Sequence, residues 1–93
     1  MNFNIFVKND DGLSNAVKIE CPNIHHMTVS DFINTSTKHL REMNSNNNIY
    51  SFYYLCETNR NIKIYITESD ELFCKTYTNY FNIGVYFNFI EQN

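Results

Sequence analysis

The sequence predicts an α+β fold in which one long helix packs against a mixed sheet of four to five strands. Two patterns support this prediction. The stretch 27–43 has apolar residues at helical spacing, whereas most of the remaining chain alternates apolar and polar residues as strands do. The length of 93 residues and the hydrophobic content of 43% are sufficient for one core. We therefore expect a single domain that spans residues 1–93, with one additional short helix.

A helix over residues 28–44 is the element around which the chain is organised. Thr28 can cap its first turn through the hydroxyl, and Asp31 follows three residues later, as in a capping box. Met27 precedes the cap and can pack on Phe32 as a hydrophobic staple. The spacing predicts one apolar stripe, formed by Val29, Phe32, Ile33, Ser36, Leu40 and Met43.

The strands are predicted from two-residue alternation between turn signals. The turn 9–12 ends in Gly12 and separates the first two strands, and Pro22 ends the second strand because it cannot donate to a ladder. The predicted strands cover 2–8, 16–21, 49–57, 62–67 and 81–89.

The segment after the fourth strand is predicted to begin a short helix. Ser69 offers a hydroxyl cap, and Asp70 and Glu71 follow in the first turn, where the positive end of a helix favours acids. Asn79 would end this helix, and residues 91–93 are expected to be a frayed end.

The predicted core combines the helix stripe with one face of each strand. Its expected members are Ile5, Val7, Val17, Ile19, Val29, Phe32, Ile33, Leu40, Ile64, Val85 and Phe87. The third strand is apolar on both faces. Its buried side therefore stays open between two sets, which are Tyr50, Phe52 and Tyr54 or Ile49, Tyr53 and Leu55.

The order of the predicted elements is strand, strand, helix, strand, strand, short helix, strand. A right-handed crossover through the helix places the first and last strands side by side and parallel in the middle of the sheet. One long helix clasped by such a sheet is the ubiquitin-like β-grasp arrangement, and we take it as the predicted fold.

Composition and motifs argue against catalysis and against nucleic-acid binding. The formal net charge is −3 and the chain has no run of Lys or Arg, so a basic patch for phosphate contacts is not expected. Gly12 and Gly84 are the only glycines, which excludes a glycine-rich phosphate loop. We expect no enzymatic activity and no cofactor.

Cysteine and histidine are the remaining residue types that could carry chemistry. Cys21 lies close in sequence to His25 and His26, but no second pair stands at zinc-ligand spacing, so we expect no metal site. Cys21, Cys56 and Cys74 are expected to be reduced thiols, two or three of them buried. The chain has no signal-peptide pattern and no membrane-spanning run, which favours a cytoplasmic protein without membrane contact.

The run from Ile64 to Leu72, followed by a short helix and the strand 83–90, resembles the Phox-and-Bem interaction domain of the PB-one type. Those domains have this length and order of elements, and they enter their second helix through a turn like Ser69-Asp70-Glu71. The resemblance implies a non-catalytic interaction module that pairs front to back with itself or with a related domain. One partner offers an acidic motif, and the other offers a basic face with a lysine on its first strand.

Residue by residue, the resemblance implies that Lys8 is the lysine of the first strand and that Lys18 lies beside it on the second. The acidic motif would consist of Glu57, Glu68, Asp70 and Glu71. The hairpin between the third and fourth strands departs from the family pattern at Arg60, which is basic.

Two alternatives stay open. A Ras-association-like module would bind a small GTPase through its second strand and Lys18. A structural assembly subunit would use a strand edge, guarded in the fourth strand only by Lys63, or an exposed sheet face rich in aromatic and Asn side chains. The tyrosines that could form such a face are Tyr50, Tyr53, Tyr65, Tyr80 and Tyr86. Salt should weaken charge pairing but not apolar association.

Overall fold

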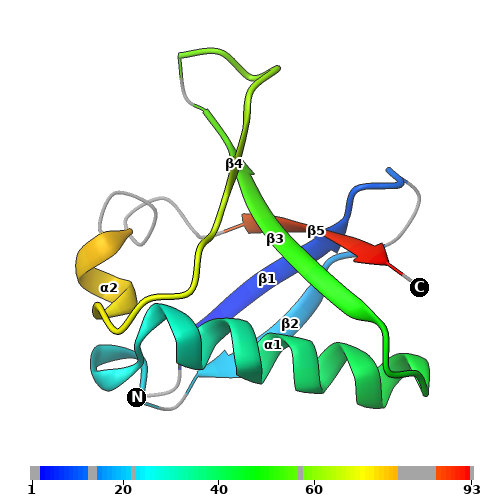
Figure 1. Cartoon of the computed structure of the whole chain (residues 1–93), viewed down its shortest axis with the longest axis horizontal. Coiled ribbons are helices and arrows are strands. Elements are labelled where there is room, and N and C mark those ends of the chain that lie inside the picture. The colour runs from blue at the N-terminus through cyan, green and yellow to red at the C-terminus, as the bar shows by residue number, and fades with distance from the viewer. Residues whose placement is uncertain (1–2, 13–14, 22, 57, 78–85, 93) are drawn as a thin grey trace.

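The computed structural model describes residues 3–12, 15–21, 23–56, 58–77 and 86–92. They form an α+β fold with a five-stranded mixed sheet and one main helix, which confirms the predicted class (Figure 1). The elements are β1 (Phe3–Asn9), β2 (Val17–Cys21), the 3-10 turn η1 (Ile24–His26), α1 (Val29–Asn44), β3 (Ile49–Leu55), β4 (Lys63–Tyr65), α2 (Phe73–Thr76) and β5 (Tyr86–Gln92).

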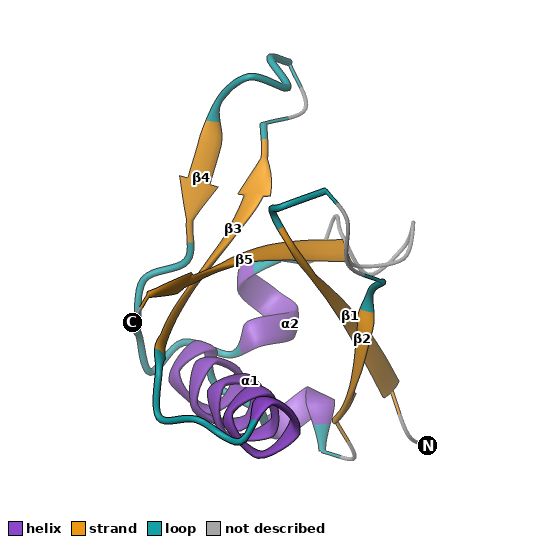
Figure 2. Cartoon of the chain, turned by 90° about the vertical axis from the view of Figure 1, so that its right-hand side faces the viewer, coloured by secondary structure: helices purple, strands orange, loops and turns teal. Residues whose placement is uncertain are grey.

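The sheet has the strand order β2-β1-β5-β3-β4. The first and last strands lie in its middle and run parallel, with Val7 beside Phe87, as the sequence predicts. The other three pairings are antiparallel. Both helices lie on the same side of the sheet, and β2 and β4 form its two edges (Figure 2). The other side of the sheet carries no helix in the described part of the chain, and we call it the open face.

The start of α1 is fixed by the predicted capping box. The amide of Asp31 donates to Oγ1 of Thr28 at 3.0 Å, and the amide of Thr28 donates to Oδ2 of Asp31 at 3.1 Å. The helix ends at Ser45, which adopts the left-handed conformation with φ 54°. The predicted stripe is buried up to Leu40 except for Ile33, which is partly buried, but Met43 is 51% exposed, so its assignment to the stripe was wrong.

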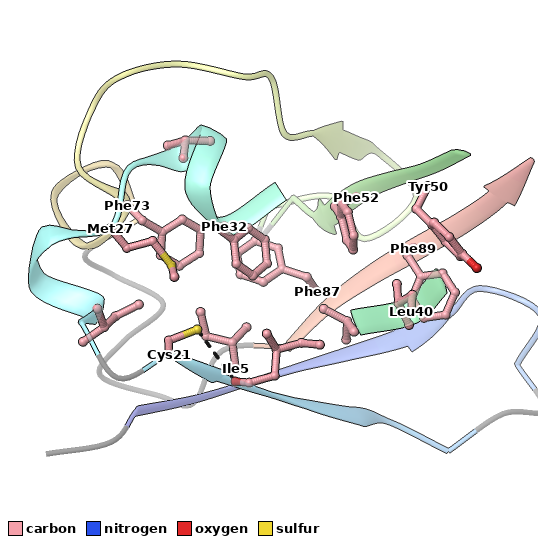
Figure 3. Close-up of a cluster of buried hydrophobic side chains, with 14 residues drawn as sticks. Ile5, Cys21, Met27, Phe32, Leu40, Tyr50, Phe52, Phe73, Phe87 and Phe89 are labelled. Atoms are coloured by element: carbon pink, nitrogen blue, oxygen red, sulfur yellow. Dashed lines mark hydrogen bonds between the residues drawn. The ribbon is translucent and has the colours of Figure 1, made fainter. Parts of the chain in front are cut away.

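Phe32 is the centre of the core (Figure 3). Its ring stacks on Phe73 with a centroid distance of 4.5 Å and contacts Phe87 at 5.4 Å and Phe52 at 5.7 Å. Seven predicted members are buried, namely Ile5, Val7, Ile19, Val29, Phe32, Leu40 and Phe87. Val17 and Ile33 are partly buried against this core.

Two predicted core residues, Ile64 and Val85, are not among the buried residues described above. Ile64 is only half-buried and is not part of the core cluster, because β4 is an edge strand that extends beyond the helices. Val85 lies outside the described residues. Buried residues outside the list of expected core members include Ile24, Met27, Phe73 and Phe89, together with Cys21, which was expected only as one of two or three buried cysteines, and with Tyr50 and Phe52 from one of the two candidate sets of the third strand.

Both faces of β3 carry a buried tyrosine, but in the second candidate set only Tyr53 is buried, because Ile49 is 62% exposed and Leu55 is half-buried. Tyr50 and Phe52 belong to the core on the helix side, and Tyr54 packs against it. Tyr53 points to the open face, yet it is only 4% exposed. Tyr50 and Tyr53 are both buried and therefore cannot contribute to an exposed tyrosine face, and the side chains of Tyr80 and Tyr86 lie outside the described ones.

Two predictions about the last part of the chain and one about the cysteines are wrong. The short helix begins at Phe73 with Leu72 as its N-cap residue, not at Ser69, and it has no side-chain cap. Residues 91 and 92 are not a frayed end but the last residues of β5. Among the three free cysteines only Cys21 is buried, whereas Cys56 and Cys74 are half-buried.

Candidate interaction surfaces

Three lysines project from the open face of the sheet, and we call Lys8, Lys18 and Lys63 the lysine face. Lys8 lies on β1 beside Asn88 of β5 and is exposed. Lys18 lies on the edge strand β2, 4.0 Å from the carboxylate of Glu20. Because both members of this pair are more than half exposed, water screens it and Lys18 stays available to a partner.

Lys63 is the lysine that the sequence did not assign to this face. Its Nζ lies 3.6 Å from the carboxylate of Asp10 and 4.9 Å above the ring of Tyr53. Tyr65 covers the same ring from β4 at a centroid distance of 5.5 Å. Burial raises the pKa of the Tyr53 hydroxyl, an effect that the Lys63 charge opposes. Lys63 and Tyr65 are two residues apart on β4 and so lie on the same face of the sheet. This spacing was the one signal in the sequence for the face that Lys63 occupies.

The segment 67–71 joins β4 to α2 and carries three exposed carboxylates, and we call it the acidic loop. Its main chain is bound to the start of α1. The amide of Val29 donates to the carbonyl of Glu71 at 2.9 Å, and the amide of Ser30 donates to the carbonyl of Ser69 at 3.0 Å. These bonds satisfy helix donors that have no partner inside the helix, and they hold the loop in place.

Two hydroxyl groups order the end of the acidic loop. Oγ of Ser69 accepts from the amide of Glu71 at 3.2 Å, so this hydroxyl closes a local turn and does not cap α2. Oγ1 of Thr76 donates to Oε2 of Glu71 at 3.4 Å and lies 2.9 Å from the carbonyl of Leu72. Glu68 and Asp70 have no such contact in the described residues and point into solvent.

The structure brings Glu68, Asp70 and Glu71 together in one loop, whereas Glu57 lies outside the described residues. The residues on either side of that position, Cys56 and Thr58, lie at the turn end of the β3–β4 hairpin. The acidic loop begins at the other end of β4 (Figure 1). The lysine face is on the open face and the acidic loop is beside α1, so the two charged surfaces lie on different sides of the sheet.

An open hollow of about 480 Å³ lies between β2, η1 and α1. Its lining includes the carboxylates of Glu20 and Asp31, together with His26. Asp31 is already engaged in the capping box of α1. The edge of the sheet at β2 is therefore flanked by negative charge as well as by Lys18.

The cysteine and histidine residues do not converge. Cys21 is fully buried and its Sγ lies 3.7 Å from the carbonyl of Ile19, whereas His25 and His26 are exposed. Within the described residues, no three His, Cys, Asp or Glu side chains are close enough to hold a metal ion. No helix in that part of the chain is both long and apolar enough to cross a membrane.

The chain matches no model of a known protein family, and no curated protein or solved structure matches it either.

Proposed function

We propose that this domain is a non-catalytic protein–protein interaction module with a ubiquitin-like β-grasp fold, which pairs front to back as Phox-and-Bem domains do. The strand order β2-β1-β5-β3-β4 and the parallel central pair support the fold assignment. The observation that carries the function is the separation of the lysine face from the acidic loop on two sides of the sheet. One molecule can then offer each surface to a different neighbour.

The charges favour a head-to-tail contact over a symmetric contact of like surfaces. Two lysine faces brought together would oppose Lys8, Lys18 and Lys63 to copies of themselves, which costs free energy. Each exposed ion pair contributes about 0–1 kcal/mol, so several pairs have to act together. The resulting association should weaken as salt rises.

A small-GTPase-binding module has less support. Such a module pairs its second strand with the partner and uses basic residues to meet an acidic surface. Here Glu20 lies beside Lys18 on β2, and Asp31 lines the adjacent hollow. These carboxylates would repel an acidic partner.

The test uses two variants that each remove one surface. Lys8→Glu reverses charge on the lysine face and keeps the acidic loop, whereas Asp70→Lys does the opposite. Each variant alone should be unable to self-associate through these surfaces, but an equimolar mixture should form a one-to-one complex, because each retains the surface that the other lacks. Sedimentation velocity at low salt and at about 0.5–1 M salt measures this. Lys38→Glu, on an exposed position of α1, is the matched control.

Self-association through these two surfaces is refuted if the mixture contains no complex at low salt while both variants are folded by circular dichroism. Should the natural chain show no self-association, the same two variants are tested against candidate partner domains.

A further inference from the structure

The edge strand β4 presents to solvent main-chain groups that have no partner among the described residues. The amide of Ile66 donates to the carbonyl of Phe52 at 2.8 Å, and the amide of Cys56 donates to the carbonyl of Ile62 at 3.0 Å. Hydrogen-bonded pairs alternate along an antiparallel ladder, so the pairs of Lys63 with Leu55 and Tyr65 with Tyr53 lie between bonded ones. The amides and carbonyls of Lys63 and Tyr65 therefore point away from β3.

Space beyond this edge is open to another strand. β4 is the last strand of the sheet, and the hairpin it forms with β3 rises clear of both helices (Figure 2). Lysines often protect such edges. Lys63, however, is directed across the open face by Asp10 and the Tyr53 ring, and not outwards along the edge.

The sequence of this edge is self-complementary. Residues 62–66 read Ile-Lys-Ile-Tyr-Ile, which is symmetric in polarity about Ile64. An antiparallel copy centred on Ile64 sets Ile62 opposite Ile66 on one face of the ladder. On the other face it sets Lys63 opposite Tyr65, whose ring offers a cation–π contact rather than a like charge. The outward main-chain groups of Lys63 and Tyr65 are in register for four new hydrogen bonds.

The charged residues that flank β4, Arg60 and Glu68, are also placed symmetrically about Ile64. Arg60 precedes β4 by three residues and Glu68 follows it by three, and both are exposed. Neither side chain has an ion pair in the described part of the chain. In the register centred on Ile64, Arg60 lies next to Glu68 of the partner subunit, and the two-fold symmetry repeats this contact.

From these observations we propose that β4 pairs with β4 of a second copy of this chain, so that the two five-stranded sheets join into one. The interface is symmetric and closes at two molecules. It does not rest on the front-to-back pairing proposed above, which uses the lysine face and has a different symmetry. An edge of five residues belongs with small interfaces, so the dimer is reversible and its fraction rises with protein concentration.

A cysteine introduced on the two-fold axis tests the register. Residue 64 lies opposite itself in a non-hydrogen-bonded pair, where Cα atoms are about 4.5 Å apart and a disulfide fits. Ile64→Cys should therefore form a 64–64 disulfide under mild oxidation, identified by peptide mapping. Ile62→Cys is the matched control, because its two copies would be separated by four residues, or about 14 Å along the strands. Equal cross-linking of both variants, or none at 64 in a folded protein, would refute this register.

A charge exchange tests the same dimer without a cross-link. Arg60→Glu and Glu68→Arg should each weaken dimerisation about tenfold, since symmetry doubles the effect of one exposed pair. The double variant should restore it. Two weakened single variants without recovery in the double variant would contradict the proposed contact.

Two more variants separate this dimer from the front-to-back pairing. Tyr65→Pro removes an outward amide, which an edge strand tolerates, together with the ring that lies against Tyr53, and should abolish the 64–64 cross-link in the Ile64→Cys background. Tyr65→Ala, which removes the same ring and keeps the amide, is its control and should retain the cross-link. Lys8→Glu should leave that cross-link unchanged. If Lys8→Glu abolishes it while Tyr65→Pro has no effect, the association runs through the lysine face and the edge dimer is wrong.

Discussion

Oε1 of Glu91 accepts a hydrogen bond of 2.6 Å from the side-chain amide of Asn48, 43 positions earlier in the chain. The same oxygen lies 2.9 Å from the amide nitrogen of Asn46 and 3.3 Å from the hydroxyl of Tyr50. One carboxylate therefore joins the end of β5 to the loop that follows α1. A charged acceptor that serves several donors is stronger than a neutral one.

Glu91→Ala should lower the free energy of unfolding by about 1–3 kcal/mol, because it removes the charged acceptor that Asn46, Asn48 and Tyr50 share. Glu91→Gln keeps an acceptor oxygen and should lose less. Urea unfolding of both variants measures the difference. Glu42→Ala, at an exposed helix position, is the control and should change stability by no more than about 0.5 kcal/mol. A loss for Glu91→Ala as small as that of the control would mean that the cluster contributes no stability.

Phe32→Ala should be the most damaging single truncation on α1. The side chain is 0% exposed and its ring contacts three other aromatic rings, so the variant loses transfer free energy and leaves a cavity. The expected cost is about 3–5 kcal/mol. Met43→Ala, which truncates a side chain that is 51% exposed, serves as the comparison and should cost far less. Similar unfolding midpoints for the two variants would show that Phe32 is not in the core.

Ser36→Ala should stabilise the protein. Ser36 is 0% exposed within the apolar stripe of α1, and its hydroxyl has no hydrogen-bond partner among the described residues. Replacing it removes the cost of a buried polar group and raises helix propensity. We expect a gain of about 0.5–1.5 kcal/mol in chemical denaturation. Ser30→Ala, on the same helix at a half-buried position, controls for propensity alone. A destabilised Ser36→Ala variant would mean that the hydroxyl has an acceptor in solution.

Cys21 makes stability depend on pH above neutrality. Burial, with a smaller contribution from the Cys74 thiol, raises the pKa of Cys21 from its ordinary value of 9.0 to about 11. The folded state therefore retains the proton over a range in which the unfolded chain releases it. This contribution to stability is complete below pH 9.0 and is lost as the pH rises towards about 11.

The measurement is thermal unfolding between about pH 8 and pH 11 for the natural chain and for Cys21→Ala. The variant starts from a lower stability, but its melting temperature should fall less steeply above pH 9.0. Parallel curves for the two proteins would contradict the role assigned to this thiol.

Local signals predicted the parts of the fold that depend on local chemistry. Thr28 and Asp31 are three residues apart and form the expected capping box, so the start of α1 was accessible from the sequence. Ser69 has the same kind of signal and does not cap a helix. Its carbonyl and that of Glu71 bind the amides of Ser30 and Val29, a long-range contact that no local pattern reports.

In the candidate surfaces, too, some features follow from local sequence patterns and others from long-range contacts. The resemblance to Phox-and-Bem domains implied that Lys8 and Lys18 lie side by side, and strand alternation is consistent with one face for both. The position of Lys63 depends on Asp10, which lies in a turn more than fifty residues earlier in the chain. Likewise, Lys63 and Tyr65 reach the Tyr53 ring on the open face from the neighbouring strand. Such contacts require the pairing of strands to be known first.

The parallel pairing of β1 with β5 also constrains how the protein is made. The strand that completes the middle of the sheet is the last one to leave the ribosome, and it brings Phe87 and Phe89 to the core. Until then, β1 and β3 have no central neighbour, and the Phe32 ring lacks one of its contacts. A nascent chain that stops before residue 86 should therefore expose apolar surface and depend on chaperones. Folding of this domain therefore cannot be completed before its last strand has been synthesised.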